Sequence, residues 1–124
     1  MQKKRPKHLA LHLIKLPLPG LVSILHRISG LALFLAIPLL LLMFQYSLRS
    51  VETYASLQDV MNYPLVKLIL LGLLWSFLHH FCAGLRYLAI DLHYINNLKK
   101  ARDSSKVVML VSLLLTILIG AKLW

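Results

Sequence analysis

Residues 28–48 read ISGLALFLAIPLLLLMFQYSL, an apolar run with no charged side chain between Arg27 and Arg49. A helix needs about 20 mainly apolar residues to cross the hydrocarbon core of a bilayer, so this run is long enough to span a membrane. Pro38 lies within it, where we expect it to kink the helix without ending it. The run is also too long for the apolar part of a cleaved signal peptide, so we predict a retained transmembrane helix.

Two further uncharged runs follow the first. Residues 68–85 read LILLGLLWSFLHHFCAGL, and residues 107–121 read VVMLVSLLLTILIGA. Long basic side chains flank both runs and can reach the headgroup level, which extends a short span. We therefore predict an all-α integral membrane protein of three transmembrane helices, with spans at about residues 22–49, 64–93 and 104–124. The three spans form one membrane domain at residues 21–124. A polar turn at residues 97–105 joins the second span to the third.

The composition supports a membrane protein over a soluble one. Of the 124 residues 59% are hydrophobic, which is more apolar surface than a soluble domain of this size can bury. The net charge of +10 would suit a nucleic-acid-binding protein, but the charges lie almost entirely outside the apolar runs. That placement is typical of membrane topology, so we expect lipid, and no nucleic acid, as a partner.

The basic residues also predict the orientation of the chain. One cluster lies in an N-terminal basic segment, residues 1–20, and the other lies between the second and third runs. The connection between the first and second runs has only Arg49 and Lys67, offset by Glu52 and Asp59. Cytoplasmic loops carry an excess of Lys and Arg. We therefore expect the N-terminus on the cytoplasmic or matrix side.

A first group of polar residues lies at the inner start of the first span, in SILHRISG at Ser23–Gly30. His26, Arg27 and Gly30 lie three, four and seven positions after Ser23 and share one face of a helix with it. A hydroxyl, an imidazole and a guanidinium are suitable donors for anionic or carbonyl oxygens. The alternative is that Arg27 only reaches toward the headgroups and Ser23 caps a helix.

A second group, HHFCAGLRY, lies at the inner end of the second span. His80 is followed four residues later by Gly84, and a glycine there leaves room for the edge of a flat porphyrin whose iron the imidazole ligates. A packed, hydrogen-bonded histidine is the alternative. His79 and His80 are about 100° apart around the helix, so they cannot be opposite ligands of one iron. Cys82, the only cysteine, is expected to be a buried apolar residue.

Depth connects the two groups. His80 lies six residues before Arg86, roughly 9 Å inside the inner boundary at 1.5 Å per residue. His26 and Arg27 lie at that boundary on the first helix. A haem ligated by His80 could therefore direct its propionates toward His26 and Arg27.

These two motifs resemble the signatures of the cytochrome b membrane-anchor subunit of succinate dehydrogenase. SILHRISG and HFCAGLRYLAID, at Ser23–Gly30 and His80–Asp91, carry the resemblance, and Arg5-Pro6 and the three-span layout agree with it over nearly the whole chain. The resemblance implies that His80, and not His79, is an axial ligand of haem b. It also implies that Ser23 and Arg27 help to bind ubiquinone, and that His26 and Arg27 lie near the haem propionates.

The resemblance further implies a larger assembly. A second small three-span anchor subunit would supply the other haem ligand and complete a multi-helix bundle, and iron–sulfur and flavoprotein subunits would dock on the inner face. The expected location is the bacterial inner (plasma) membrane, or the mitochondrial inner membrane if the gene is organellar. The sequence departs from the family at Tyr87, where a second histidine often follows the motif arginine, so the resemblance implies no haem or quinone contact at that position.

Two alternatives remain from the sequence. A fumarate reductase-type anchor would use menaquinone in the reverse reaction. The other alternative is a haem-free membrane scaffold, or a small transporter subunit whose histidines and Arg86 line a polar path. The chain has no flavin fingerprint, cysteine cluster or dicarboxylate pocket, so we expect it not to act on succinate alone.

Overall fold

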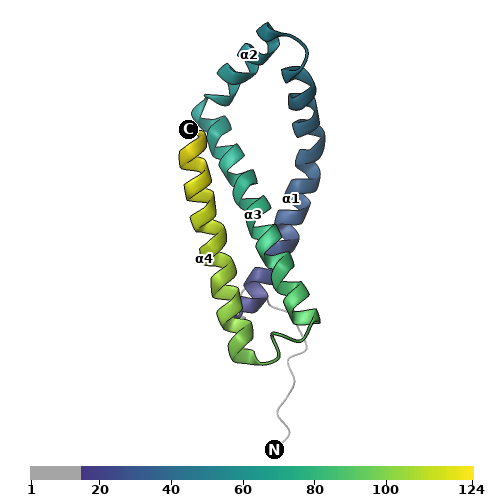
Figure 1. Cartoon of the computed structure of the whole chain (residues 1–124), viewed down its shortest axis with the longest axis vertical. Helices are drawn as coiled ribbons and strands as arrows, with labels where there is room; N and C mark the ends of the chain where they lie inside the picture. The colour runs from purple at the N-terminus through teal and green to yellow at the C-terminus, as the bar shows by residue number, and fades with distance from the viewer. Residues whose placement is uncertain (1–14) are drawn as a thin grey trace, which may run out of the picture.

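A computed structural model describes residues 15–124, and all of its regular elements are helices. They are α1 (Leu18–Ser47), α2 (Val51–Met61), α3 (Pro64–Asp91) and α4 (Leu98–Leu123) (Figure 1). Helices α1, α3 and α4 are each long and apolar enough to cross a membrane. The predicted all-α, three-span architecture is therefore confirmed. Most of the N-terminal basic segment, including Arg5 and Pro6, lies outside the described residues.

Proline residues begin two of the spanning helices. Pro17 precedes α1, and Pro64 is the first residue of α3, where a missing N–H costs nothing. Because α1 begins at Leu18, Ser23 lies inside the helix, and the alternative in which it caps the helix is wrong. Pro38 lies within α1 without ending it, as expected.

The two connections differ from the sequence prediction. Helix α2 fills the connection between α1 and α3 and begins with a capping box in which Ser50 and Thr53 bond each other's backbone N–H groups. Helix α4 begins at Leu98, capped by the Asn97 side chain, which accepts from the Lys100 N–H at 2.8 Å. The predicted polar turn at residues 97–105 is therefore mostly helix. Ser104 and Ser105 fit there because their hydroxyls donate to the Ala101 carbonyl oxygen.

Helix α3 is the centre of the arrangement. It packs extensively against both α1 and α4, whereas α1 and α4 contact each other less. Helices α1 and α3 lie close together near the N-terminal end of the bundle and diverge toward α2 (Figure 1). The close contacts that hold α1 against α3 are therefore concentrated in the half of the bundle that carries the two polar motifs.

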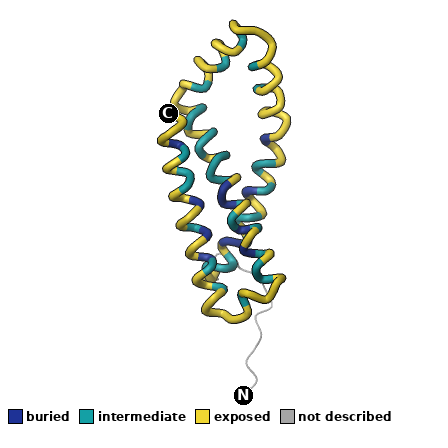
Figure 2. The backbone as a smooth tube through the Cα atoms, in the orientation of Figure 1, coloured by how far each residue is buried: buried dark blue, intermediate teal, exposed yellow. Residues whose placement is uncertain are grey.

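Few side chains are buried within the chain. Val22, Ala83 and Val108, one from each spanning helix, form the buried apolar cluster. Most of the backbone belongs to exposed or half-buried residues (Figure 2). The large apolar side chains on that surface have no water to avoid in a bilayer, where lipid or other helices cover them.

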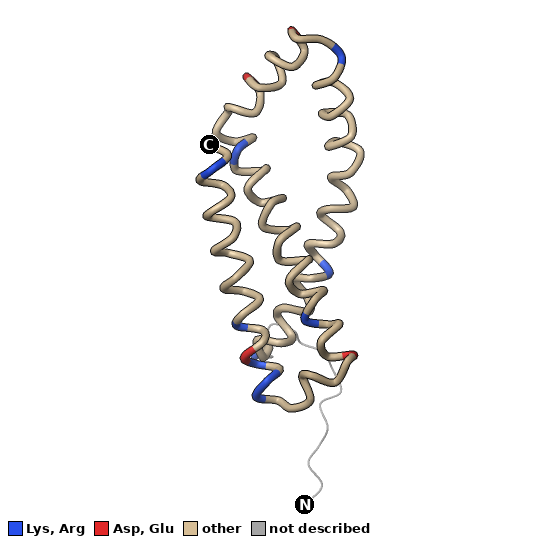
Figure 3. Tube along the Cα trace, viewed as in Figure 1, with Lys and Arg blue, Asp and Glu red and all other residues tan. Residues whose placement is uncertain are grey.

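The charged residues lie mainly at the two ends of the bundle (Figure 3). Most of the described Lys and Arg residues of α4 lie beside the α3–α4 connection, at the end of the bundle where α1 begins. At the other end Lys67 lies with its Nζ 5.9 Å from the centre of the Trp124 ring. The bundle therefore has one strongly basic end and one weakly charged end.

Candidate functional site

The two polar motifs meet where α1 and α3 are closest. The rings of His26 and His80 stack at 4.2 Å between centroids, with 8° between their planes. The centroid of the Tyr87 ring lies 5.1 Å from that of His26, and the two ring planes are tilted by 60°. Two motifs far apart in the sequence therefore form one cluster, at one depth in the bundle.

His80 is hydrogen-bonded to α1 through one nitrogen only. Its Nδ1 lies 3.0 Å from the His26 carbonyl oxygen and 3.3 Å from Ser29 Oγ. Ser29 is buried, and its hydroxyl donates to the same His26 carbonyl at 2.9 Å. No hydrogen bond from residues 15–124 reaches Nε2 of His80. The imidazole is thus fixed at one nitrogen, and the other is available to a ligand from outside the chain.

Glycine at position 30 makes this arrangement possible, and the sequence analysis did not assign it that role. A Cβ at Gly30 would lie 2.9 Å from Cε1 of His80, closer than real side chains approach. Gly84, which the sequence analysis selected, faces His26, whose Nε2 would lie 3.9 Å from an added Cβ. The spacing of Gly30 within its motif was visible in the sequence, but its neighbour on α3 was not.

Ser23 and Arg27 lie one turn apart on α1, before and after His26 in the sequence. Ser23 is half-buried and Arg27 is exposed. Residues four apart are neighbours on a helix surface, so the hydroxyl and the guanidinium can reach one bound molecule. Neither side chain makes a hydrogen bond to another described residue, which leaves the donors of both available.

His79 lies in a different environment from His80. It has no exposed surface, its ring stacks on Trp75 at 5.1 Å, and both of its nitrogens lack a hydrogen-bond partner among the described residues. The main chain of Val22 lies beside the ring, outside hydrogen-bonding geometry. A ligand from another chain cannot reach these nitrogens without opening the bundle, whereas half-buried His80 is accessible.

Arg86 is a buried polar residue that joins two helices, a role that was not predicted from the sequence. It is 6% exposed, its Nε donates to Ser104 Oγ at 3.0 Å, and its Nη2 donates to the Ala101 carbonyl at 3.2 Å. Its guanidinium also lies 5.6 Å from the centre of the Tyr87 ring. Arg86 therefore links α3 to the first turns of α4 and supports the tyrosine that contacts His26.

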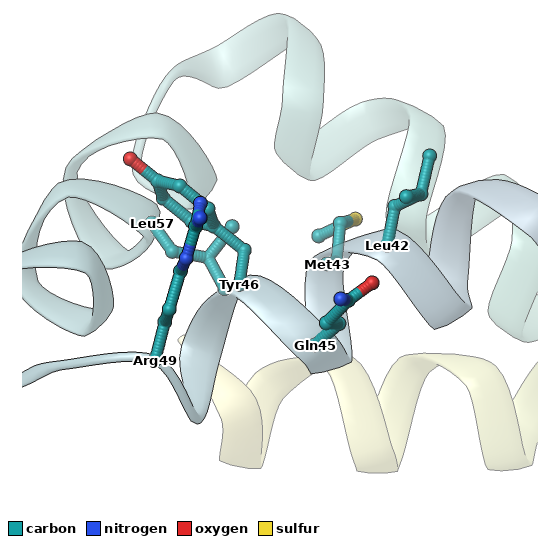
Figure 4. A pocket seen from close by; sticks show the side chains of 6 residues that line it. All are labelled: Leu42, Met43, Gln45, Tyr46, Arg49 and Leu57. Carbon is teal, nitrogen blue, oxygen red and sulfur yellow. The ribbon is translucent and has the colours of Figure 1, made fainter.

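A separate pocket lies at the opposite end of α1 (Figure 4). Leu42, Met43, Gln45, Tyr46 and Arg49 line it from α1 and the adjoining turn, and Leu57 lines it from α2. Met43 is 17 residues after His26, about 25 Å along the helix at 1.5 Å per residue. The pocket is therefore not part of the histidine cluster.

Proteins of known family resemble this chain over most of its length. The family model for the succinate dehydrogenase/fumarate reductase transmembrane subunit matches residues 1–119. The succinate dehydrogenase cytochrome b556 subunit of Coxiella burnetii is 34% identical over 125 residues, covering 100% of both chains. That of Paracoccus denitrificans is 32% identical over 114 residues, covering 92% of this chain and 88% of the relative. The chain therefore belongs to the family of succinate dehydrogenase cytochrome b membrane-anchor subunits.

Proposed function

We propose that this chain binds haem b and ubiquinone in a succinate dehydrogenase complex and supports electron transfer from the iron–sulfur subunit to quinone. One observation carries the proposal: His80 is tied to α1 through Nδ1 while Nε2 has no partner within the described chain. The names of the relatives as cytochrome b556 subunits and the Nε2 of His80, unpartnered among residues 15–124, both support His80 as an axial ligand.

His80 would supply one nitrogen to the haem iron, and bound haem b would supply a one-electron couple. His80 is half-buried, so one side of its ring remains open to another chain. Three helices are also too few to enclose a porphyrin. These two facts support a second, smaller anchor subunit that supplies the other ligand and completes the bundle. His26 and Arg27, beside His80 on α1, would lie near the propionates.

Ser23 and Arg27 would bind quinone next to this cluster. Quinone reduction develops negative charge on a carbonyl oxygen, and preorganised donors stabilise such charge most where water is scarce. A hydroxyl and a guanidinium one turn apart on α1 provide those donors. Arg27 is exposed on the chain, which would let quinone approach between this subunit and its partners.

The distribution of charge supports an orientation with the basic end on the cytoplasmic side of a bacterial inner membrane. The histidine cluster and Arg27 then lie toward that side, where water can supply the protons for quinone reduction. The iron–sulfur and flavoprotein subunits would dock on the same face, since the succinate chemistry needs groups that this chain lacks.

Haem binding is tested by a reduced-minus-oxidised absorption spectrum of the complex purified with its partner subunits. His80→Leu should remove or strongly shift the reduced haem bands. His93→Leu, in the exposed α3–α4 connection, is the matched control and should leave them unchanged. An unaltered spectrum in the His80→Leu complex would exclude His80 as the ligand.

Quinone binding is tested separately with Ser23→Ala and Arg27→Leu. Loss of a hydrogen bond to developing charge costs about 1.5–3 kcal/mol, so quinone reduction should slow roughly 10-fold or more. Succinate oxidation by a soluble artificial acceptor should stay at the parental rate in both variants. Arg49→Leu, at the far end of α1, is the control and should keep the parental rates of quinone reduction and of succinate oxidation. Equal quinone reduction in all complexes would contradict the assignment, and comparing ubiquinone with menaquinone analogues distinguishes the fumarate reductase-type alternative.

A further inference from the structure

The hydrogen bonds around His80 determine which of its nitrogens carries the proton. A carbonyl oxygen accepts hydrogen bonds and cannot donate them. Since Nδ1 of His80 lies 3.0 Å from the His26 carbonyl oxygen, Nδ1 must be the donor. A neutral imidazole has one N–H group, so Nε2 then carries the lone pair that a metal requires.

Ser29 completes this arrangement. Its hydroxyl hydrogen is directed to the His26 carbonyl oxygen at 2.9 Å, so its oxygen lone pairs remain for the Nδ1–H group at 3.3 Å. The side chain is 2% exposed, so water does not compete for these bonds. The Nδ1–H group of His80 thus has two acceptors, and both belong to the same turn of α1.

That turn also restricts the orientation of the imidazole ring. The His26 ring covers one face of His80 at 4.2 Å, and Gly30 lets the helix backbone approach the Cε1 edge. Rotation of the His80 ring would break the Nδ1 bonds and move its edge against α1. Residues of one turn therefore define both the tautomer and the direction of Nε2.

We propose that Ser29 is a positioning residue for His80: together with the His26 carbonyl it holds the imidazole in the Nδ1–H tautomer, with Nε2 directed to the haem iron. The inference rests on the proposed ligation by His80. Hydrogen-bond partners of the ring nitrogen that does not bind the metal fix the orientation of a ligand histidine and raise its basicity. Loss of such a partner typically lowers metal affinity about 10–100-fold. A more basic ligand favours ferric over ferrous haem.

The test compares Ser29→Ala with the parent in the purified complex. We expect a higher haem midpoint potential, an altered low-spin ferric electron paramagnetic resonance spectrum, and haem transfer to excess apomyoglobin roughly 10-fold faster. Ser29→Thr keeps a hydroxyl and should restore the parental values. If Ser29→Ala fails to assemble, Ser29→Cys conserves the volume with a weaker acceptor and should shift all three measurements the same way.

Ser112→Ala is the matched control. Ser112 is fully buried in α4, and its hydroxyl also donates to the carbonyl three residues earlier, that of Met109. Its loss should leave the haem measurements unchanged. Parental potential, spectrum and haem transfer in Ser29→Ala would overturn the role of Ser29 alone, if His80→Leu still removes the haem. Haem retained by His80→Leu would overturn both proposals.

Discussion

The imidazoles of His26 and His80 lie face to face at 4.2 Å, although 54 positions separate the two residues in the chain. Side chains in direct contact lie at one depth in the membrane. The C-terminal end of α3 and the beginning of α1 must therefore be on the same side of the bilayer, which constrains the topology independently of the charge distribution.

Cysteine labelling of intact cells tests this topology. In a Cys82→Ala background, Lys15→Cys and His93→Cys should be protected from a membrane-impermeant maleimide until the membrane is opened. Ser56→Cys, on exposed α2, should react from outside in intact cells. Labelling of Lys15→Cys and His93→Cys from opposite sides would contradict a common site for the two motifs.

Replacing His79 should affect the complex differently from replacing His80. Burying polar nitrogens without partners costs about 1–3 kcal/mol, and an apolar ring of similar shape avoids that cost. His79→Phe should therefore keep the haem spectrum, with thermal stability equal to the parent or higher. Spectra before and after a thermal ramp of the detergent-solubilised complex provide both measurements. Loss of haem in His79→Phe would indicate that His79, and not His80, is the ligand.

A methyl group at Gly30 should disturb the site, because an added Cβ would lie 2.9 Å from Cε1 of His80. Overpacking of this kind costs about 1–3 kcal/mol, and here the displaced group is the proposed ligand. Gly30→Ala should lower the melting temperature and the haem content of the complex. Gly72→Ala is the control: nothing lies within 4 Å of its added Cβ, so it should be neutral or stabilise α3 by up to about 1 kcal/mol. Equal behaviour of the two variants would argue against the close approach.

Arg86 should matter for the α3–α4 pair. Its guanidinium is nearly buried and bonds both Ser104 Oγ and the Ala101 carbonyl. Arg86→Leu removes two bonds from a charged donor and should cost about 2–4 kcal/mol, seen as a lower melting temperature. Arg86→Lys should restore only part of this, because an ammonium lacks the planar fork of donors. Arg49 is exposed, so Arg49→Leu should change stability by under about 0.5 kcal/mol. If Arg49→Leu lowered the melting temperature as much as Arg86→Leu, the effect would come from the loss of a positive charge and not from the Arg86 hydrogen bonds.

Much of the architecture was predictable from the sequence because lipid allows few solutions. Backbone groups in the bilayer must bond within their own segment, so long uncharged runs become helices. The three spans follow from residues 28–48, 68–85 and 107–121 on this basis. The start of α4 and the helix α2 did not follow, because they depend on the local caps made by Asn97 and Ser50.

The sequence by itself determined which residues share a helix face, and it placed both motifs near one membrane boundary, with His80 about 9 Å deeper than His26. In the structure the two rings instead stack at one depth. Only the tertiary structure decided which residues touch. The rotation of α3 against α1 turns His79 into the interior and His80 toward the His26 carbonyl, and it sets Gly30, not Gly84, against the His80 ring. The physical reason is that a helical period fixes directions around one axis, whereas contacts depend on how two axes pack, which is decided by side chains far apart in the chain.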